Sequence, residues 1–176
     1  MNLVAKHGQM VRNVFLNVEL LLNNGVRELS EYDIQGMMFL GFRTALVNTD
    51  WRADRETTGK VDCVLFDGVA PRVLYEIKTY FKPREKLRLV DFQKDLEKLH
   101  ELKIKYRGVR AYFLVAARKN KIKQTALASA PILERLLHPR NRTWKSFILT
   151  DGTKVRLRPS RKEQHGQSAV VTWEVK

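Results

Sequence analysis

Two short apolar runs on either side of a tight turn constrain the fold of this chain most strongly. The first run covers residues 61–66, the second covers residues 73–78, and Asp67-Gly68 begins the turn between them. Asp-Gly between apolar runs is typical of a β-hairpin, because its residues tolerate the backbone angles of a tight turn. We therefore predict two antiparallel strands that pair directly with each other.

The second predicted strand carries two charged residues, Glu76 and Lys78, separated by Ile77. Alternate residues of a strand project from the same face, so both charged side chains point one way while Ile77 faces the core. Burying such charges without partners is unfavourable. Asp62 lies on the preceding run, where hairpin pairing places it beside Glu76. We expect two carboxylates and one ammonium group to converge here.

This combination of groups suits a divalent metal ion that acts on phosphate. Mg²⁺ prefers oxygen ligands and keeps coordination positions for water and for phosphate oxygens. The ion neutralises developing charge and lowers the pKa of its bound water, while a nearby lysine positions that water or stabilises the transition state. The simpler alternative is a cross-strand salt bridge on a solvated sheet face.

The acid-x-Lys pattern is weak on its own, because the chain contains it three times. Besides Glu76-Ile77-Lys78, it occurs at residues 101–103 and 174–176. Residues 101–103 lie in a predicted helix, where positions two apart diverge. Residues 174–176 close the sequence and have no hairpin aspartate before them. The strand bearing Asp62 and the tight turn distinguish the pattern at residues 76–78.

Patterns elsewhere indicate one α/β domain over residues 1–176. Apolar residues at helical spacing predict further elements. The predicted helices cover residues 3–22, about 30–47, 90–106 and 122–137. The further predicted strands are a short one near Trp51, a buried one over residues 111–116, and two or three within residues 144–176.

In this order of elements, and in Asp62 followed by Glu76-Ile77-Lys78, the chain resembles the PD-(D/E)XK nuclease superfamily over roughly residues 28–117. The resemblance implies a restriction-endonuclease-like core, αβββαβ, within about residues 28–137, with a mixed central sheet flanked by helices. The helix 3–22 and the strands of residues 144–176 would extend this core.

The resemblance also implies phosphodiester hydrolysis with Mg²⁺, for which Mn²⁺ can substitute. Asp62, Glu76 and the backbone carbonyl of Ile77 would be metal ligands, and Lys78 would be the catalytic lysine. The proline that precedes the aspartate in the superfamily's pattern is replaced here by Val61.

Many members of the superfamily also place a glutamate on the first core helix. Glu31 is the best match, and Asp33 is the second. Acidic residues are favoured in the first turn of a helix by its dipole, and Ser30 with Asp33 fits a capping box. Glu31 is therefore open to two interpretations, a helix-capping acid and a catalytic residue that acts as a metal ligand.

The charge of the chain indicates a polyanionic partner. The 33 Lys and Arg residues outnumber the 19 Asp and Glu residues, which leaves a net charge of +14. Basic runs are often only solvated faces, but this excess is not balanced by acids, so we expect phosphate contacts. The candidate nucleic-acid-binding residues follow two of the predicted strands: Lys82, Arg84, Lys86, Arg88, Arg118, Lys119 and Lys121.

We therefore expect a Mg²⁺-dependent endonuclease that acts on duplex or branched DNA, with DNA favoured over RNA. The alternatives are a catalytically silent nucleic-acid-binding protein on the same fold and a basic ribonucleoprotein component. A homodimer would supply two sites for two strands, with helix 3–22 at its interface.

The lone Cys63 excludes an internal disulfide, and neither a signal peptide nor a membrane span is evident, so we expect a cytoplasmic protein without a membrane partner.

If the basic loop after residue 78 contacts phosphates, replacing Lys82, Arg84 and Lys86 together by Ala should weaken DNA binding for all sequences alike. The slope of log K against log salt concentration should become less steep, by an amount that corresponds to the loss of up to about three phosphate contacts, because fewer counterions are released. Fluorescence anisotropy over a salt series measures this slope. An unchanged slope would show that the loop is only solvated.

Overall fold

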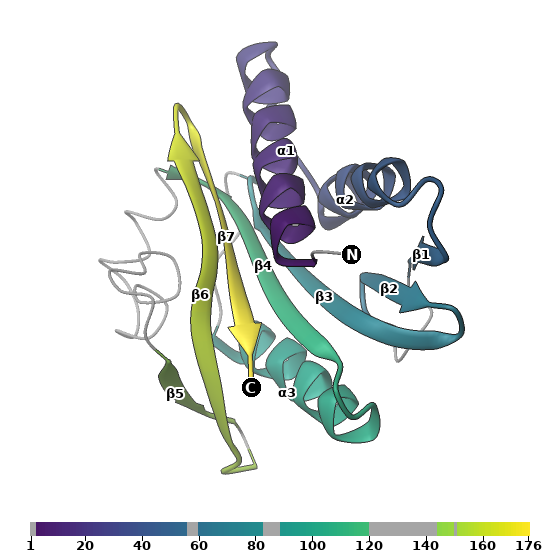
Figure 1. The fold of residues 1–176 in the computed structure, drawn as a ribbon. Coiled ribbons are helices and arrows are strands. Elements are labelled where there is room, and N and C mark those ends of the chain that lie inside the picture. The colour runs from purple at the N-terminus through teal and green to yellow at the C-terminus, as the bar shows by residue number, and fades with distance from the viewer. Residues whose placement is uncertain (1–2, 56–59, 83–88, 120–143, 150) are drawn as a thin grey trace.

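The computed structural model describes residues 3–55, 60–82, 89–119, 144–149 and 151–176. The described chain has an α/β fold with a mixed sheet of seven strands and three helices (Figure 1). The helices are α1 (Leu3–Asn23), α2 (Glu31–Ala45) and α3 (Leu89–Lys105). The strands are β1 (Trp51–Asp54), β2 (Cys63–Asp67), β3 (Ala70–Tyr80), β4 (Arg110–Arg118), β5 (Lys145–Ile148), β6 (Lys154–His165) and β7 (Ser168–Val175).

The strands follow the order β1-β2-β3-β4-β7-β6-β5 across the sheet. The central pair, β3 and β4, is parallel and is connected through α3, whereas the other neighbouring strands are antiparallel. The predicted hairpin is confirmed as β2 and β3, with Gly68 at a positive φ of 60° in its turn. The backbone there adopts a left-handed conformation that glycine takes without strain.

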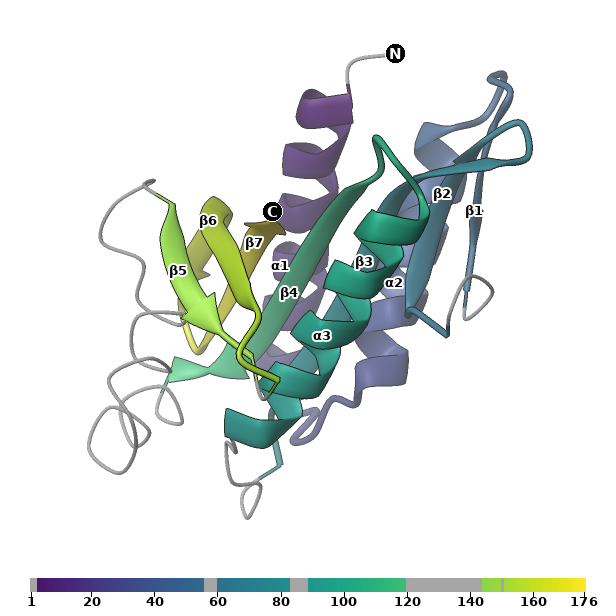
Figure 2. The same ribbon diagram turned by 90° about the horizontal axis from the view of Figure 1, so that it is seen from below.

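The helices cover both faces of the sheet, as Figure 2 shows: α3 lies on one face, and α1 and α2 lie on the other. Each face has its own buried cluster. Successive residues of β3 alternate between the clusters, with Leu74 facing α3 and Tyr75 and Ile77 facing α1 and α2. By this alternation Glu76 lies on the α3 side of the strand.

Most local predictions agree with the structure. α1 matches the predicted helix 3–22, and three strands form the predicted C-terminal extension. Ser30 caps α2: its Oγ accepts a hydrogen bond from the Asp33 amide at 3.3 Å, and Asp33 Oδ2 accepts one from the Ser30 amide at 2.7 Å. The helix predicted over residues 122–137 lies outside the described residues. None of the described helices combines the length and the apolar character that crossing a bilayer requires.

The strand boundary closest to the candidate metal ligands, the start of β2, differs from the prediction. The first strand of the hairpin was predicted over residues 61–66, but β2 begins only at Cys63, so Asp62 precedes the strand. The pairing of β2 with β3 ends at Cys63 and Tyr75. Asp62 instead contacts β3 through its side chain, which apolar alternation along the strand does not reveal.

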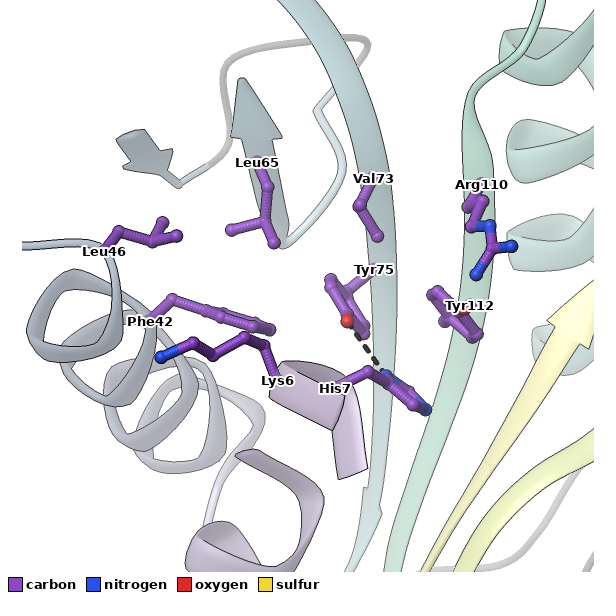
Figure 3. Close-up of a pocket in the computed structure, with 9 residues that line it drawn as sticks. All are labelled: Lys6, His7, Phe42, Leu46, Leu65, Val73, Tyr75, Arg110 and Tyr112. Atoms are coloured by element: carbon purple, nitrogen blue, oxygen red, sulfur yellow. Dashed lines mark hydrogen bonds between the residues drawn. The ribbon is translucent and has the colours of Figure 1, made fainter. Parts of the chain in front are cut away.

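A buried histidine fastens α1 to the sheet (Figure 3). His7 is 4% exposed; its Nδ1 lies 2.9 Å from Tyr75 Oη, and its Nε2 lies 2.8 Å from Ser160 Oγ and 3.2 Å from Thr172 Oγ1. The ring also stacks on Tyr112, with centroids 4.1 Å apart. The first turns of α1 are thus joined to β3, β4, β6 and β7.

The environment of this histidine favours its neutral form. Burial, followed by the positive charges of Arg110 and Arg161, lowers the pKa of His7 from 6.5 to about 4. A neutral imidazole can both donate and accept, which suits its hydroxyl partners. A charged ring would be buried beside two guanidinium groups.

This histidine should make the fold acid-sensitive. Because the pKa of His7 is lower in the folded chain than in the unfolded chain, the unfolded state takes up an extra proton as the pH falls below 6.5. Between pH 7 and pH 4.5, His7 should therefore remove about 2–3 kcal/mol of unfolding free energy. Urea unfolding at both pH values should show a loss larger by about this amount in wild type than in His7→Gln. Equal losses in the two proteins would contradict the assignment.

Candidate active site

The candidate site forms where β3 extends beyond its partner β2. The pairing with β2 ends at Tyr75, while β3 continues to Tyr80 alongside β4. The edge of β3 that faced β2 is therefore unpaired by strand from Glu76 onward within the described residues. At this edge, the backbone amide of Ile77 donates a hydrogen bond to Asp62 Oδ2 at 2.7 Å. The carboxylate of Asp62 is thereby held next to Glu76.

Asp62 is fixed from its other side by α2. Its backbone carbonyl accepts a hydrogen bond from Nε2 of Gln35 at 2.7 Å, and Gln35 is only 2% exposed. Burial raises the pKa of Asp62 to about 6, although the Ile77 amide and the charge of Lys98 act in the opposite direction. Asp62 is thus held by one hydrogen bond to its side chain and one to its backbone. Its carboxylate lies in surroundings that disfavour its charged form.

Glu76 is more deeply buried than Asp62 and is 4% exposed. Its Oε1 accepts a hydrogen bond from the ammonium group of Lys98, which reaches it from α3. Its Oε2 is buried and has no hydrogen-bond partner among the described residues. Burial and then the charge of Asp62 raise the pKa of Glu76 to about 9. A buried polar atom without a partner is unusual in a folded protein and is available to a ligand.

Lys78 lies between two other carboxylates. Its Nζ is 3.0 Å from Asp95 Oδ2 on α3 and 3.2 Å from Glu31 Oε1 at the start of α2. Burial opposes the charge of Lys78, but Asp95 and Glu31 together raise its pKa above the usual value. Within the described chain no ion pair joins Lys78 to either Asp62 or Glu76, so the simple salt bridge among these three is not formed.

The structure separates the two candidate acids of α2. Asp33 completes the capping box with Ser30, while Glu31 extends to Lys78. Of these two acids of α2, Glu31 is therefore the one that contacts the candidate site, where it forms an ion pair with the ammonium group of Lys78.

Two residues of the site, Asp95 and Lys98, were missed by sequence reasoning. They lie three positions apart on α3, beside the buried Leu96 and Leu99. Burial also raises the pKa of Asp95, against the opposing charge of Lys78. Charged residues at the margin of an apolar helix stripe are most often solvated, so their spacing alone gave no reason to select them.

Lys98 also connects α3 to the segment before β2. Its ammonium donates to the carbonyl oxygen of Lys60 at 3.1 Å. Lys60 has a positive φ of 59°, a left-handed conformation that a residue with a side chain adopts infrequently. Such conformations persist where surrounding contacts hold them, and they are concentrated at functional sites.

Three of the seven basic residues predicted to bind nucleic acid are described, and they lie at the same end of the sheet as the site. β3 and β4 are parallel, with Lys78 opposite Val115, so their carboxyl ends point the same way. Lys82 is exposed just beyond β3, and Arg118 and Lys119 end β4 and follow it. The guanidinium of Arg118 donates to the carbonyl of Arg27 at 2.7 Å. The remaining candidates lie outside the described residues: Arg84, Lys86, Arg88 and Lys121.

The side chains alone do not form a complete metal cage. Among the described residues, no three His, Cys, Asp or Glu side chains are grouped to hold an ion by themselves. Asp62 and Glu76 supply two carboxylates, so further ligands would come from the backbone and from water. An open coordination sphere of this kind is typical of Mg²⁺ sites.

The pocket drawn in Figure 3 is separate from this site. It is lined by Lys6, His7, Phe42, Leu46, Leu65, Val73, Tyr75, Arg110 and Tyr112. The pocket lies on the side of the sheet that α1 and α2 cover, whereas Glu76 lies on the other side of β3. The pocket is therefore not part of the candidate active site around Glu76.

Comparisons of this chain with protein-family models and with curated proteins find no match.

The hydrogen bond from Gln35 to the Asp62 carbonyl should be needed for stability. Gln35→Met keeps the length of the side chain but removes the donor, which leaves a carbonyl without its partner. We expect the unfolding free energy to fall by about 1–3 kcal/mol, measured by urea denaturation. Gln9→Met on α1, where the amide bonds only the exposed Asn13, should change it by less than about 0.5 kcal/mol. Equal effects of the two substitutions would contradict this assignment.

Proposed function

We propose that the protein is a metal-dependent endonuclease that hydrolyses phosphodiester bonds of duplex or branched DNA on a restriction-endonuclease-like core. The observation that carries this proposal is the placement of Asp62 and Glu76 together at the free edge of β3, with Lys78 two residues further along the strand. The element order α2-β1-β2-β3-α3-β4 supports it, because it matches the αβββαβ order of that core.

The residues present fit a divalent ion. The charge of Asp62 disfavours the charge of Glu76, and Glu76 Oε2 is buried without a hydrogen-bond partner among the described residues. Asp62, Glu76 and the carbonyl of Ile77 would hold Mg²⁺ or Mn²⁺, since these hard ions prefer oxygen ligands. When bound, such an ion stabilises negative charge on the phosphate and acidifies a water molecule.

The other residues of the site position positive charge. Asp95 and Glu31 hold the ammonium group of Lys78 from two different helices, and this restricts its position. A fixed cation beside the metal-binding carboxylates can orient the attacking water and stabilise the charge of the transition state. Glu31 and Asp95 are positioning residues in this scheme, and Lys78 is the catalytic residue.

The charge distribution supports DNA as the substrate. The net charge of +14 draws polyanions to the protein, and Lys82 and Lys119 lie at the end of the sheet that carries the site. We favour DNA over RNA. A homodimer would provide two sites for two strands, and α1 leaves Leu16 and Leu20, four residues apart, exposed for such a contact.

Wild-type protein should nick or linearise supercoiled plasmid DNA with Mg²⁺ or Mn²⁺ and should be inactive in EDTA. Asp62→Asn and Lys78→Ala should each reduce the cleavage rate by at least about 100-fold, because one loses a metal ligand and the other loses the catalytic charge. Both variants should still bind the plasmid, since each changes one charge in a strongly basic protein.

The matched controls lie away from the site, on β2 and on α3. Asp67→Asn at the far end of β2 and Lys105→Ala at the end of α3 should cleave at nearly the wild-type rate. Wild-type protein that binds DNA but never cuts it would replace this proposal with a silent nucleic-acid-binding protein. A rate unaffected by Asp62→Asn would remove the carboxylates from the chemistry.

A further inference from the structure

Glu76 already has a cation of its own. The ammonium group of Lys98 contacts Glu76 Oε1, and the same ammonium donates to the carbonyl of Lys60 at 3.1 Å. The side chain of Lys98 is 30% exposed and that of Glu76 is 5% exposed, so the pair lies at the boundary between the interior and solvent. A lysine there can leave its partner without unfolding α3, because its flexible stem can redirect the ammonium towards water.

The two lysines of the site have different partners. Lys78 is held by Asp95 and Glu31, at 3.0 and 3.2 Å. Lys98 is the lysine that pairs with Glu76. A cation that binds Glu76 must therefore compete with Lys98, whereas it leaves both ion pairs of Lys78 in place.

We propose that Lys98 is a built-in counterion of the metal centre. It neutralises Glu76 while the centre holds no ion, it withdraws when a divalent ion binds, and it thereby sets the ion concentration that the centre requires. This inference rests on the proposed function, because it presupposes that Asp62 and Glu76 bind an ion.

The competition follows from charge and does not depend on which oxygen the ion takes. An ion on Oε1 would displace the ammonium directly, and an ion on the free Oε2 would lie within a few ångströms of it. A dication and an ammonium group repel each other at that separation, even where water screens them strongly. The carbonyl of Lys60 remains as a partner for the displaced ammonium.

Removing the charge of Lys98 should therefore tighten metal binding. Even with the screening of bulk water, the lost repulsion corresponds to about a tenfold change in the dissociation constant. A proton that takes the place of Lys98 on Glu76 does not cancel this effect, because it carries one charge while the metal ion carries two. The direction of the change is thus the same whether or not Glu76 is protonated in the metal-free variant.

The test measures binding of Mn²⁺ to the DNA-free full chain by titration calorimetry. Lys98→Met removes the charge, and Lys98→Gln removes it while keeping a hydrogen-bond donor for Glu76 and for the Lys60 carbonyl. Both variants should bind Mn²⁺ about tenfold more tightly than wild type. Lys98→Arg keeps the charge and should stay within about threefold of wild type. Lys94→Met, at an exposed position of the same helix, is the matched control and should also stay within that range.

The possible outcomes separate this inference from the proposed function. Wild type and the uncharged variants binding Mn²⁺ equally would overturn the role of Lys98 and leave the metal centre standing. Weaker binding by both uncharged variants would also overturn it, and would show that Lys98 supports the site instead of opposing the ion. No binding by any protein would overturn the inference and the metal centre together. Thermal unfolding in EDTA identifies a variant that fails to fold. If Lys98→Met does not fold, the comparison is made with Lys98→Gln alone.

Discussion

The hydrogen bond between the Asp62 carboxylate and the Ile77 amide joins the fold to the candidate site. A buried backbone amide must find a partner, and β2 does not supply one because its pairing with β3 ends at Tyr75. The side chain of Asp62 takes the place of the missing strand. Because β2 is short, the Ile77 amide needs another acceptor, and the carboxylate that accepts its hydrogen bond lies beside Glu76. The position at which β2 ends therefore determines where the Asp62 carboxylate contacts β3.

Because side chains alternate along β3, the packing contacts with α1 and the charged residues of the candidate site lie on opposite faces of the strand. Tyr75 faces α1, where it contacts His7 Nδ1 through its hydroxyl group, and Glu76 faces α3, where one of its oxygens has no hydrogen-bond partner among the described residues. The two side chains differ by one position and lie in opposite environments. The first environment favours a neutral imidazole, as the lowered pKa of His7 shows. The second holds charged groups of both signs, which makes it the face that a cation or an anionic substrate can perturb.

The sequence was sufficient for those features that depend on neighbouring residues. Alternation, turn residues and a cap predicted the hairpin of β2 and β3, helix α1 and the box of Ser30 with Asp33. The proximity of Asp62 and Glu76 also followed from the hairpin. The partners of Lys78 did not, because Glu31 and Asp95 reach it from separate helices whose packing no local pattern encodes. Lys98 was missed for the same reason: its contact with Glu76 spans 22 positions of the chain and depends on how α3 crosses the sheet.

The charges of the assembled site differ in sign from the charge of the strongly basic protein, and this difference bears on the proposed metal ion. Its carboxylates are those of Asp62, Glu76, Glu31 and Asp95, and its ammonium groups are those of Lys78 and Lys98. With every group ionised, four negative and two positive charges leave a local excess of two negative charges, the amount that one divalent ion neutralises. Burial, followed by the charge of neighbouring carboxylates, raises the pKa values of Asp62 and Glu76, so the ionised forms of both groups are disfavoured here. The whole chain nevertheless carries a net charge of +14, so the positive excess lies outside this cluster, where it can attract a polyanion without filling the site. Under the proposed function, a locally negative centre on a positive protein would accommodate both a cation and a phosphate backbone, and the two kinds of ligand would use different groups.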